Sequence, residues 1–394
     1  MKLISFVIPS RNNKKYLEWS YNSIRKNLGY THEILLADDF STDGTWEYLQ
    51  EVKDKDINVQ IFRNEGPVRQ GIVYWYDFLC KEADNDRVMF FHADMYACPG
   101  LDEEILKHLK KGVVVSATRI EPPLHPSGTE KLTEDFGIEP ETFDEYGLMN
   151  YIAEFQQTSN TKITNGVFAP WAIMKDDYWK VGGHDKLFAP QSKEDSDIFN
   201  RFHLSGYEFV QTWRGLVYHM TSRGSRFNPM AGGAPGKDSP EWIHTTTKNM
   251  RNFIRKWGSV VLHDEEMKPI VKPKYDIGLV VRNIDENLLR MIEPWCDTIY
   301  VDCSNSIVKK YIDEEQPNTT MNLSERIQNI KSPRNNDVVV EFDSRRLNSD
   351  NFQYIMMFPD ILQDSGQLGE LKLEIFKFEI HSLKTYEKDL ICQI

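Results

Sequence analysis

The sequence predicts an α/β fold in which a mostly parallel sheet is covered by helices on both faces, followed by a smaller α/β module. The first half alternates short apolar runs with stretches of helical periodicity, and those runs are nearly continuous Val, Ile, Leu and Phe. Strands of this kind are buried on both faces. The chain of 394 residues, with 40% apolar and 12% aromatic residues, is long and apolar enough for two cores.

In the first half, strands and helices are expected in strict alternation. Residues 16–28, for example, place Leu17, Tyr21, Ile24 and Leu28 on one face of a helix. The expected strands are residues 3–9, 33–39, 59–62, 87–94 and 113–118, and the expected helices are residues 16–28, 45–52, 68–80 and 101–110.

Three later stretches set the domain organisation. Residues 119–165 are irregular and rich in Pro, Glu and Gly, which suggests an excursion around an active site. Residues 264–276, "DEEMKPIVKPKYD", are charged and contain two prolines, as a linker does. We therefore expect a first domain over residues 1–265, a linker over 266–275 and a C-terminal α/β module over 276–394.

The C-terminal module repeats the strand–helix–strand rhythm and shows no recognisable chemistry. Strands are expected at 277–283 and 298–304, and residues 337–346 and 352–358 continue the series. The alternation of "ELKLEIFKFEI" (370–380) slips at Ile375-Phe376, which predicts a half-exposed, bulged strand. Docking, dimerisation into a homo-oligomer and acceptor binding remain open as roles for this module.

Net charge, the length of the apolar runs and the cysteine spacing indicate which partners and which cellular compartment to expect. The net charge of −13 argues against nucleic acid and anionic membranes as partners. No apolar run approaches the ~18–20 residues that span a bilayer, and the apolar segment at the N-terminus is too short for a signal peptide. The five cysteines lack CxxC spacing, which suggests reduced thiols in the cytoplasm; they are Cys80, Cys98, Cys296, Cys303 and Cys392.

In such sheets ligands bind beyond the carboxyl ends of the strands, so polar residues there are the first candidates. Asp38 and Asp39 end the second expected strand, where carboxylates can accept hydrogen bonds from a nucleobase or a ribose. The alternative is simple turn chemistry, which explains the residues from Ser41 to Thr45.

The segment "FFHADMY" ends another apolar run with His92 and Asp94. Residues two apart on a strand point to the same side. An imidazole and a carboxylate suit Mn²⁺ or Mg²⁺ bound through substrate phosphates, and the imidazole favours Mn²⁺. The alternative is a strand end in solvent.

Two further strand and helix ends carry charged side chains. Glu194 and Asp195 open a helix, where acids are stabilised by the helix dipole or serve as a base near a substrate hydroxyl. The strand "GLVYHM" ends at His219, which is either structural or a third metal ligand, and Arg223 and Arg226 follow as phosphate clamps.

Taken in order, "VIPSRNN", "LADDFSTDGT", "HAD", "GGHDKLF…EDSDIFNRF" and "VYHM" resemble the family 2 glycosyltransferases of GT-A fold. The resemblance covers roughly residues 3–225. It implies that Asp38 and Asp39 bind the base and ribose of a sugar nucleotide, with Asp39 the better match to the base contact. Pro9 and Gly71 match a first-strand proline and a glycine-bearing loop near the donor.

The same resemblance implies the rest of the site. Asp94 corresponds to the surer metal ligand of the family's DxD motif, His92 to its first position, and His219 to the late histidine that closes the metal site. Asp195 corresponds to the catalytic base. Asn165 and Trp171, with Glu194 beside the base, are the expected acceptor side.

The expected function is therefore an inverting glycosyltransferase (EC 2.4). It would move a sugar from a nucleoside-diphosphate donor, UDP-linked, to a hydroxyl on a glycan, with Mn²⁺ or Mg²⁺. The alternatives are a non-catalytic scaffold that binds sugar nucleotides or glycans, and transfer to a nucleobase or a protein hydroxyl. A sugar-phosphate nucleotidyltransferase is disfavoured, because "PSRNNKKY" after the first strand lacks the glycines that cradle a triphosphate.

Overall fold

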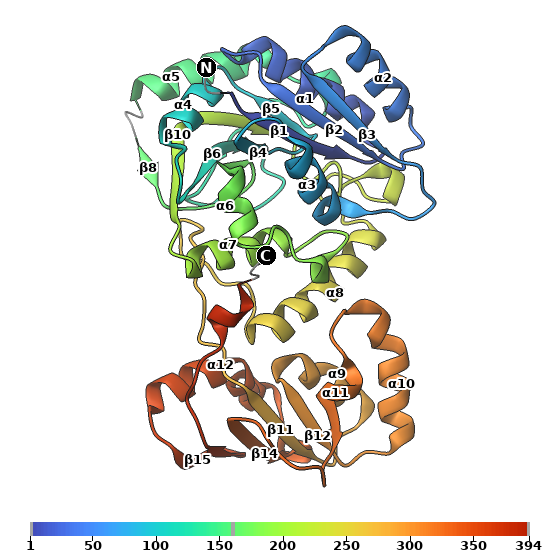
Figure 1. Ribbon diagram of the computed structural model, residues 1–394, viewed down its shortest axis with the longest axis vertical. Helices are drawn as coiled ribbons and strands as arrows, with labels where there is room; N and C mark the ends of the chain where they lie inside the picture. Colours follow the sequence, from blue (N-terminus) through green and yellow to red (C-terminus); the bar gives the residue numbers. More distant parts are fainter. Residues whose placement is uncertain (1–2, 159–161, 392–394) are drawn as a thin grey trace. The chain divides into compact units, whose positions relative to one another are not determined.

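The computed structural model describes residues 3–158 and 162–391, so Cys392 lies outside the described residues. The chain divides into two compact units, each with its own sheet and apolar core (Figure 1). Residues up to 246 together with 263–269 form the first unit, and residues 247–262 and 270–391 form the second. The predicted α/β fold, with a mostly parallel sheet and a second, smaller sheet, is confirmed.

The sheet of the first unit has the strand order β3-β2-β1-β4-β9-β6-β10-β5, with β7 beside β6 and β8 beside β10. Strand β9 is antiparallel to both of its neighbours, and β5 is antiparallel to β10; the other pairs on this path are parallel. The strands are β1 (Ser5–Ser10), β2 (Glu33–Asp39), β3 (Val59–Asn64), β4 (Arg87–Phe90), β5 (Met95–Ala97), β6 (Val113–Glu121), β7 (Leu132–Thr133), β8 (Ile163–Thr164), β9 (Trp171–Met174) and β10 (Glu208–His219).

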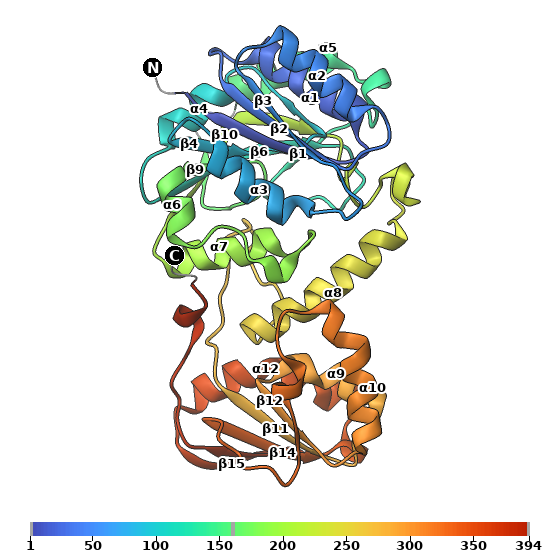
Figure 2. The same ribbon diagram turned by 45° about the vertical axis from the view of Figure 1, so that its right-hand side comes forward.

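Helices cover both faces of this sheet. In both ribbon views α1 and α2 lie on one face and α3 lies on the other (Figures 1 and 2). The helices are α1 (Lys14–Asn27), α2 (Thr45–Lys55), α3 (Gly71–Glu82), α4 (Leu101–His108), α5 (Glu145–Thr158), α6 (Lys175–Lys180), α7 (Glu194–Leu204) and α8 (Pro240–Trp257), the last of which contributes residues to both units.

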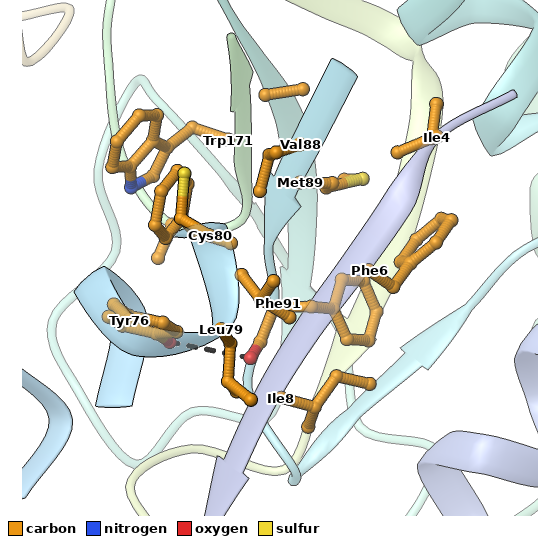
Figure 3. Packing of buried hydrophobic residues seen from close by; sticks show 14 of the residues in the cluster. Ile4, Phe6, Ile8, Tyr76, Leu79, Cys80, Val88, Met89, Phe91 and Trp171 are labelled. Carbon is orange, nitrogen blue, oxygen red and sulfur yellow. Dashed lines mark hydrogen bonds between the residues drawn. The ribbon is translucent and has the colours of Figure 1, made fainter. Parts of the chain in front are cut away.

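The apolar runs of the sequence form the core, because strands covered on both faces have no solvated side. Every residue of β1, β2 and β6 is buried. Figure 3 shows Leu79 of α3 near Ile8 of β1 and Phe91 beside Phe6, and the Tyr76 hydroxyl donates a hydrogen bond to the carbonyl of Phe91 (3.3 Å). This packing holds the carboxyl ends of β1 and β4 in fixed positions.

The excursion over residues 119–165 is more regular than the sequence suggested. It contains helix α5 and the two-residue strands β7 and β8, and β7 pairs with the end of β6 through Ile120 and Leu132. Leu148 and Ile152 of α5 are buried in a small apolar cluster. Two buried residues one turn apart were too weak a pattern to reveal this helix.

The second unit has the strand order β13-β12-β11-β14-β16-β15, in which the first four strands are parallel. Its elements are β11 (Ile277–Arg282), α9 (Glu286–Ile292), β12 (Thr298–Val301), α10 (Asn305–Glu315), α11 (Leu323–Arg326), β13 (Ile327–Asn329), β14 (Val338–Asp343), α12 (Ser349–Ser365), β15 (Gly369–Leu373) and β16 (Phe376–Ile380). Residues 352–358 lie in α12, where Ile355, Phe358 and Leu362 are buried.

The predicted bulged strand over residues 370–380 is wrong. The segment is a hairpin, in which β15 and β16 pair antiparallel and Leu373 lies opposite Phe376. Glu374 adopts a φ of 51° at the turn. The slip in the alternation marks the reversal of the chain, after which the apolar side chains return to the same face.

Two other properties bear on the sequence analysis. Among the described cysteines Cys80, Cys98 and Cys296 are buried, Cys303 is half-buried, and all four are free thiols. No helix in the described ranges combines the length and the apolar character needed to cross a membrane.

Candidate active site

A cavity of about 400 Å³ lies in the first unit at the carboxyl ends of the strands. Strand β1 contributes Pro9 and Ser10 to its wall, β2 contributes Asp39, β6 contributes Glu121, and β10 contributes His219. The first turn of α7 forms another part of the wall. The cavity is therefore at the position where parallel sheets bind their ligands.

Three side chains in this cavity could hold a metal ion. One ligand atom each from His92, Asp94 and His219 lies within 4.8 Å of the others. His92 and Asp94 lie in a turn between β4 and β5, where the Met95 N–H donates to the His92 carbonyl (3.2 Å), and not on a strand as predicted. His92 and Asp94 lie close together, as the sequence predicted, but the turn brings them together and not the two-residue spacing of a strand.

Asp94 is fixed by the backbone. Its carboxylate accepts a hydrogen bond from the Arg223 N–H (2.7 Å), and its carbonyl accepts one from the Met220 N–H (3.0 Å). Burial opposes ionisation, but His219, His92 and the Arg223 N–H lower the pKa of Asp94 to about 2. The carboxylate is thus ionised, as a metal ligand must be.

His219 is held by a carboxylate on the neighbouring strand. Its Nδ1 lies 2.8 Å from Oε1 of Glu121, and its Nε2 lies 3.4 Å from Oδ1 of Asp94. Burial lowers the pKa of His219, yet Asp94 and Glu121 outweigh it and raise that pKa to about 9.

The donor set fits a divalent metal. The Nε2 atom of His219 is buried and has no hydrogen-bond partner within the described residues, although a buried polar atom normally has one. Burial lowers the pKa of His92, which favours the neutral imidazole that binds metals. Two imidazoles and one carboxylate suit Mn²⁺ better than Mg²⁺, which prefers oxygen ligands.

The two aspartates at the end of β2 have different environments. Asp39 lies in the cavity wall, and its carboxylate accepts hydrogen bonds from the backbone N–H groups of Gln70 (2.9 Å) and Gly71 (2.8 Å). Asp38 lies away from the cavity and caps the following turn through the Ser41 N–H (3.0 Å). Adjacent strand residues point to opposite faces, so one consecutive pair could place only one carboxylate in the cavity.

Position 71 requires a glycine because Pro190 packs directly against it. A Cβ atom at this position would lie 2.2 Å from the carbonyl oxygen of Pro190, and the φ angle of Gly71 is +82°. Pro190 begins the loop that leads into α7. The glycine therefore allows this loop to approach the cavity closely.

Glu194 and Asp195 open helix α7, and both line the cavity. Asp195 is half-buried, whereas Glu194 is only 4% exposed and its Oε2 atom has no hydrogen-bond partner among the residues described. Burial and the nearby Asp195 raise the pKa of Glu194 well above its ordinary value. The pair thus combines a carboxylate that can act as a base with a carboxyl that tends to stay protonated.

Of the two arginines predicted to bind phosphate, only Arg226 has its side chain in the cavity wall. Arg226 lines the cavity and pairs with Asp238 (2.8 Å). The side chain of Arg223 is 1% exposed and donates to the carbonyl of Ile138 (2.7 Å), away from the cavity. Arg223 therefore serves the site through its backbone N–H, which binds Asp94.

Of the predicted acceptor residues, only Glu194 lines the cavity. Trp171 is buried in the core, stacked on Phe90 with ring centroids 4.1 Å apart, and Figure 3 shows it beside Val88. Asn165 is exposed at a distance from the cavity wall. The aromatic residues that do line the cavity include Trp75, Phe168 and Trp242.

Sequence reasoning missed several charged residues of the wall. Arg11 and Arg69 both bind the carboxylate of Glu241, at the start of α8, and Arg69 also binds Gln191 (2.6 Å). Arg11 directly follows the first strand, so its position was a usable signal. Arg69 precedes a helix, and Glu241 is distant in the sequence, so only the fold brings these residues together.

Residues 5–182 match the sequence profile of glycosyl transferase family 2. A curated relative, a dolichol-phosphate mannosyltransferase from Pyrococcus furiosus, is 30% identical over 112 residues. These make up 28% of this chain and 30% of the relative, so the match spans less than a third of the relative's length.

Three solved structures show a weaker likeness. GalNAc-T7 with UDP, GalNAc and Mn²⁺ has a TM-score of 0.46 and 15% identity over 80% of this chain and 55% of its own. Residues 1–349 of S. aureus TarS in complex with UDP have a TM-score of 0.40 and 16% identity, over 65% and 80% of the two chains. The mannosyltransferase PcManGT from Pyrobaculum calidifontis, in complex with GDP-Man and Mn²⁺, has a TM-score of 0.39 and 15% identity, over 55% of this chain and 56% of its own.

Proposed function

We propose, from the glycosyl transferase family 2 domain over residues 5–182, that this protein is an inverting glycosyltransferase. It would transfer a sugar from a UDP-linked donor to a hydroxyl of a glycan acceptor. The observation that carries the proposal is one cavity with a metal-ligating group, His92, Asp94 and His219, and the Asp195 carboxylate in its wall.

The nucleoside half of the donor would occupy the part of the cavity near β1 and β2. Pro9, Ser10 and Asp39 form the strand ends there, and Arg11 and Arg69 add positive charge. Both arginines are partly neutralised by Glu241, so a nucleotide would compete with this carboxylate for their N–H groups. Arginine is well suited to such contacts because its N–H donors are planar and paired.

His92, Asp94 and His219 would hold the divalent metal that the family implies. When bound, this ion supplies positive charge that stabilises the departing nucleoside diphosphate. Arg226 lies in the same cavity and adds a second cation, held in place by Asp238. Positive groups that are fixed in advance lower the barrier because they need not reorganise during the reaction.

Asp195 would act as the base. The acceptor hydroxyl loses its proton to the Asp195 carboxylate, its oxygen forms a bond to the anomeric carbon, and the bond from that carbon to the diphosphate oxygen breaks. Attack from the face opposite the leaving group inverts the configuration and requires one base. Asp195 lies in the first turn of α7, where the helix dipole favours acidic side chains.

The test combines donor screening with two substitutions. A panel of UDP-, GDP- and dTDP-sugars with Mn²⁺ should show transfer or slow donor hydrolysis with a UDP-sugar. We expect Asp195→Asn to reduce transfer by at least about 100-fold, the scale of general-base catalysis, with donor affinity little changed. Asp176→Asn, an exposed acid in the first turn of α6, is the matched control and should be fully active.

Asp94→Ala should abolish metal-dependent donor binding in calorimetric titration. Full transfer by Asp195→Asn would remove Asp195 as the base. Donor binding that is independent of metal and unaffected by Asp94→Ala would favour the scaffold alternative over an enzyme.

A further inference from the structure

Glu121 is the last residue of β6, and it lies beside His219, the last residue of β10. The two strands are parallel, and Tyr218 pairs with Ile120, so the next residues along the strands are level with each other. The register depends on an irregularity in β10, because Thr212 pairs with Ala117 but Leu216 pairs with Thr118. Without these extra residues, His219 would lie beyond the reach of Glu121.

The Glu121 carboxylate is buried and fully engaged. It is 2% exposed, and it binds His219 (2.8 Å), Arg119 (3.0 Å) and Lys131 (2.9 Å). A buried carboxylate with this many cationic partners is a fixed negative charge.

The contact between Glu121 and His219 determines which ring nitrogen of His219 faces the other two candidate metal ligands, His92 and Asp94. A carboxylate at Nδ1 keeps the proton on that nitrogen, so the lone pair of the neutral ring is on Nε2. Nε2 is the atom that lies 3.4 Å from Asp94 and has no hydrogen-bond partner within the described part of the chain. The Glu121 carboxylate therefore orients the His219 ring so that Nε2 faces the Asp94 carboxylate.

We propose that Glu121 is the positioning residue of the metal site, holding His219 with Nε2 directed at the ion while Lys131 and Arg119 hold Glu121. This inference rests on the metal in the proposed function. Metal-bound histidines commonly donate their second N–H to a carboxylate, and loss of that partner weakens metal binding by about 10- to 100-fold.

Lys131 connects this arrangement to the excursion after β6. It directly precedes β7, and the Glu134 N–H donates to the Glu121 carbonyl (3.0 Å). The returning chain thus holds Glu121 by both its backbone and its side chain. Folding of the excursion is accordingly a condition for an ordered metal site.

The test measures Mn²⁺ affinity by electron paramagnetic resonance on the full chain without donor or acceptor. We expect Glu121→Gln to weaken Mn²⁺ binding by about 10- to 100-fold. In a His219→Ala background the same substitution should cause no further loss, because Glu121 acts through His219. Glu130→Gln is the matched control, since Glu130 contacts Arg119 (3.4 Å) in the same cluster but not His219, and should leave affinity unchanged.

Lys131→Met covers the case in which Glu121→Gln fails to fold. It keeps Glu121 and His219 and removes one cation, and we expect a smaller loss of Mn²⁺ affinity, about threefold to tenfold, that also disappears in the His219→Ala background. Metal-free melting curves for every variant separate weakened metal binding from general loss of stability.

The outcomes separate this inference from the function on which it rests. Unchanged Mn²⁺ affinity in Glu121→Gln, or a loss that persists in the His219→Ala background, overturns the positioning role while the enzyme remains as proposed. A wild-type protein that binds no Mn²⁺ without donor overturns the positioning role, and one that binds none even with a UDP-sugar present overturns both; in that case Asp94→Ala will also leave donor binding unchanged.

Discussion

Glu194 and Asp195 are neighbours in the chain, yet their surroundings differ. Glu194 is buried with one oxygen unpartnered in the described structure, and Asp195 is half-buried at the same helix end. Burial makes ionisation of a carboxyl unfavourable, and the nearby Lys193 and Arg69 offset this only in part, since the pKa of Glu194 is still raised. The first turn of α7 therefore contains a carboxyl whose ionised form is unfavourable, Glu194, directly beside the proposed base.

We predict that Glu194→Gln stabilises the protein at high pH. The folded-state pKa of Glu194 is raised above its ordinary 4.5, so the unfolded chain loses this proton first and the wild type loses stability as pH rises from 4.5 towards the folded pKa. The gain in melting temperature should be near zero at pH 4 and increase through neutral pH. Melting curves at several pH values check this, and a gain that is constant with pH would contradict it.

At the residue scale, the sequence predicted which strand and helix ends matter, but not the direction of each side chain. His92, Asp94, His219 and Asp195 do meet in one cavity, because each follows a strand or opens a helix at the same edge of the sheet. The side chain of Arg223 points away from it. Spacing along the chain cannot resolve such cases, because they depend on packing with distant segments.

At the scale of elements, the loop before α7 is seated on the start of α3. The Val73 N–H donates to the Pro190 carbonyl (3.4 Å), and Gly71 leaves room for Pro190. This contact sets the distance between the Asp39 end of β2 and the first turn of α7. The part of the cavity proposed to bind the nucleoside and the proposed base are thus held together by the contact that Gly71 permits.

Gly71→Ala should lower stability and weaken donor binding, because a Cβ would lie 2.2 Å from the Pro190 oxygen. The positive φ alone costs about 1–3 kcal/mol, and the clash adds to it. Gly100→Ala is the matched control, since Gly100 has the same φ of +82° and open space around its Cβ position. Denaturant unfolding should show a clearly larger loss for Gly71→Ala, and equal losses would mean that the Pro190 contact is unimportant.

The start of α8 provides a second prediction. Glu241 neutralises Arg11 and Arg69, which otherwise repel each other in the cavity wall. Glu241→Gln should reduce stability by about 1 kcal/mol at low salt, the upper end for partly exposed pairs, and the loss should shrink in 0.5 M salt. Glu51→Gln, which removes an exposed pair with Lys55, is the control with no expected effect. A salt-independent loss would point to packing instead of charge.

The expected elements over residues 3–118 are present with shifts at their ends, because their periodicity reflects burial that the sheet enforces. The hairpin of β15 and β16 and helix α5 were not predicted correctly. In the hairpin, the chain reverses at residues 374–375 without Gly or Pro, so the slip in the alternation was the only sign of a turn, and α5 is covered on one narrow face. Local pattern is informative where burial is deep and fails where an element is half-exposed.

At the scale of the whole molecule, the two units have separate cores and separate charge networks. In the second unit Arg255 is buried with Glu293 (2.7 Å) and Glu315 (2.6 Å), and Tyr311 also binds Glu293 (2.8 Å). Arg326 also binds Glu293 (2.8 Å) and Arg251 also binds Glu315 (2.7 Å), so three guanidinium groups share these two carboxylates. Such a network is costly to break, because the remaining charges stay buried.

Arg255→Met should destabilise the second unit by about 3–5 kcal/mol and lower one of two calorimetric transitions. Adding a sugar nucleotide with Mn²⁺ should raise the other transition, since ligands stabilise only the unit that binds them. Arg282→Met, at an exposed pair with Glu341, is the control and should shift neither transition. A single transition that moves as a whole would show that the units unfold together.

The three candidate metal ligands are tied to the paired ends of β10 and β5. His219 lies opposite Met95, the Met95 N–H donates to the His92 carbonyl, and the Met220 N–H donates to the Asp94 carbonyl. Such an arrangement behaves like a rigid chelator, in which the spacing of donor atoms exists before the ion arrives. A rigid chelator cannot contract around a small ion or spread around a large one. Discrimination by ionic radius would then be a property inherited from strand pairing, and a change in the register of β10 would alter the choice of ion without touching a ligand.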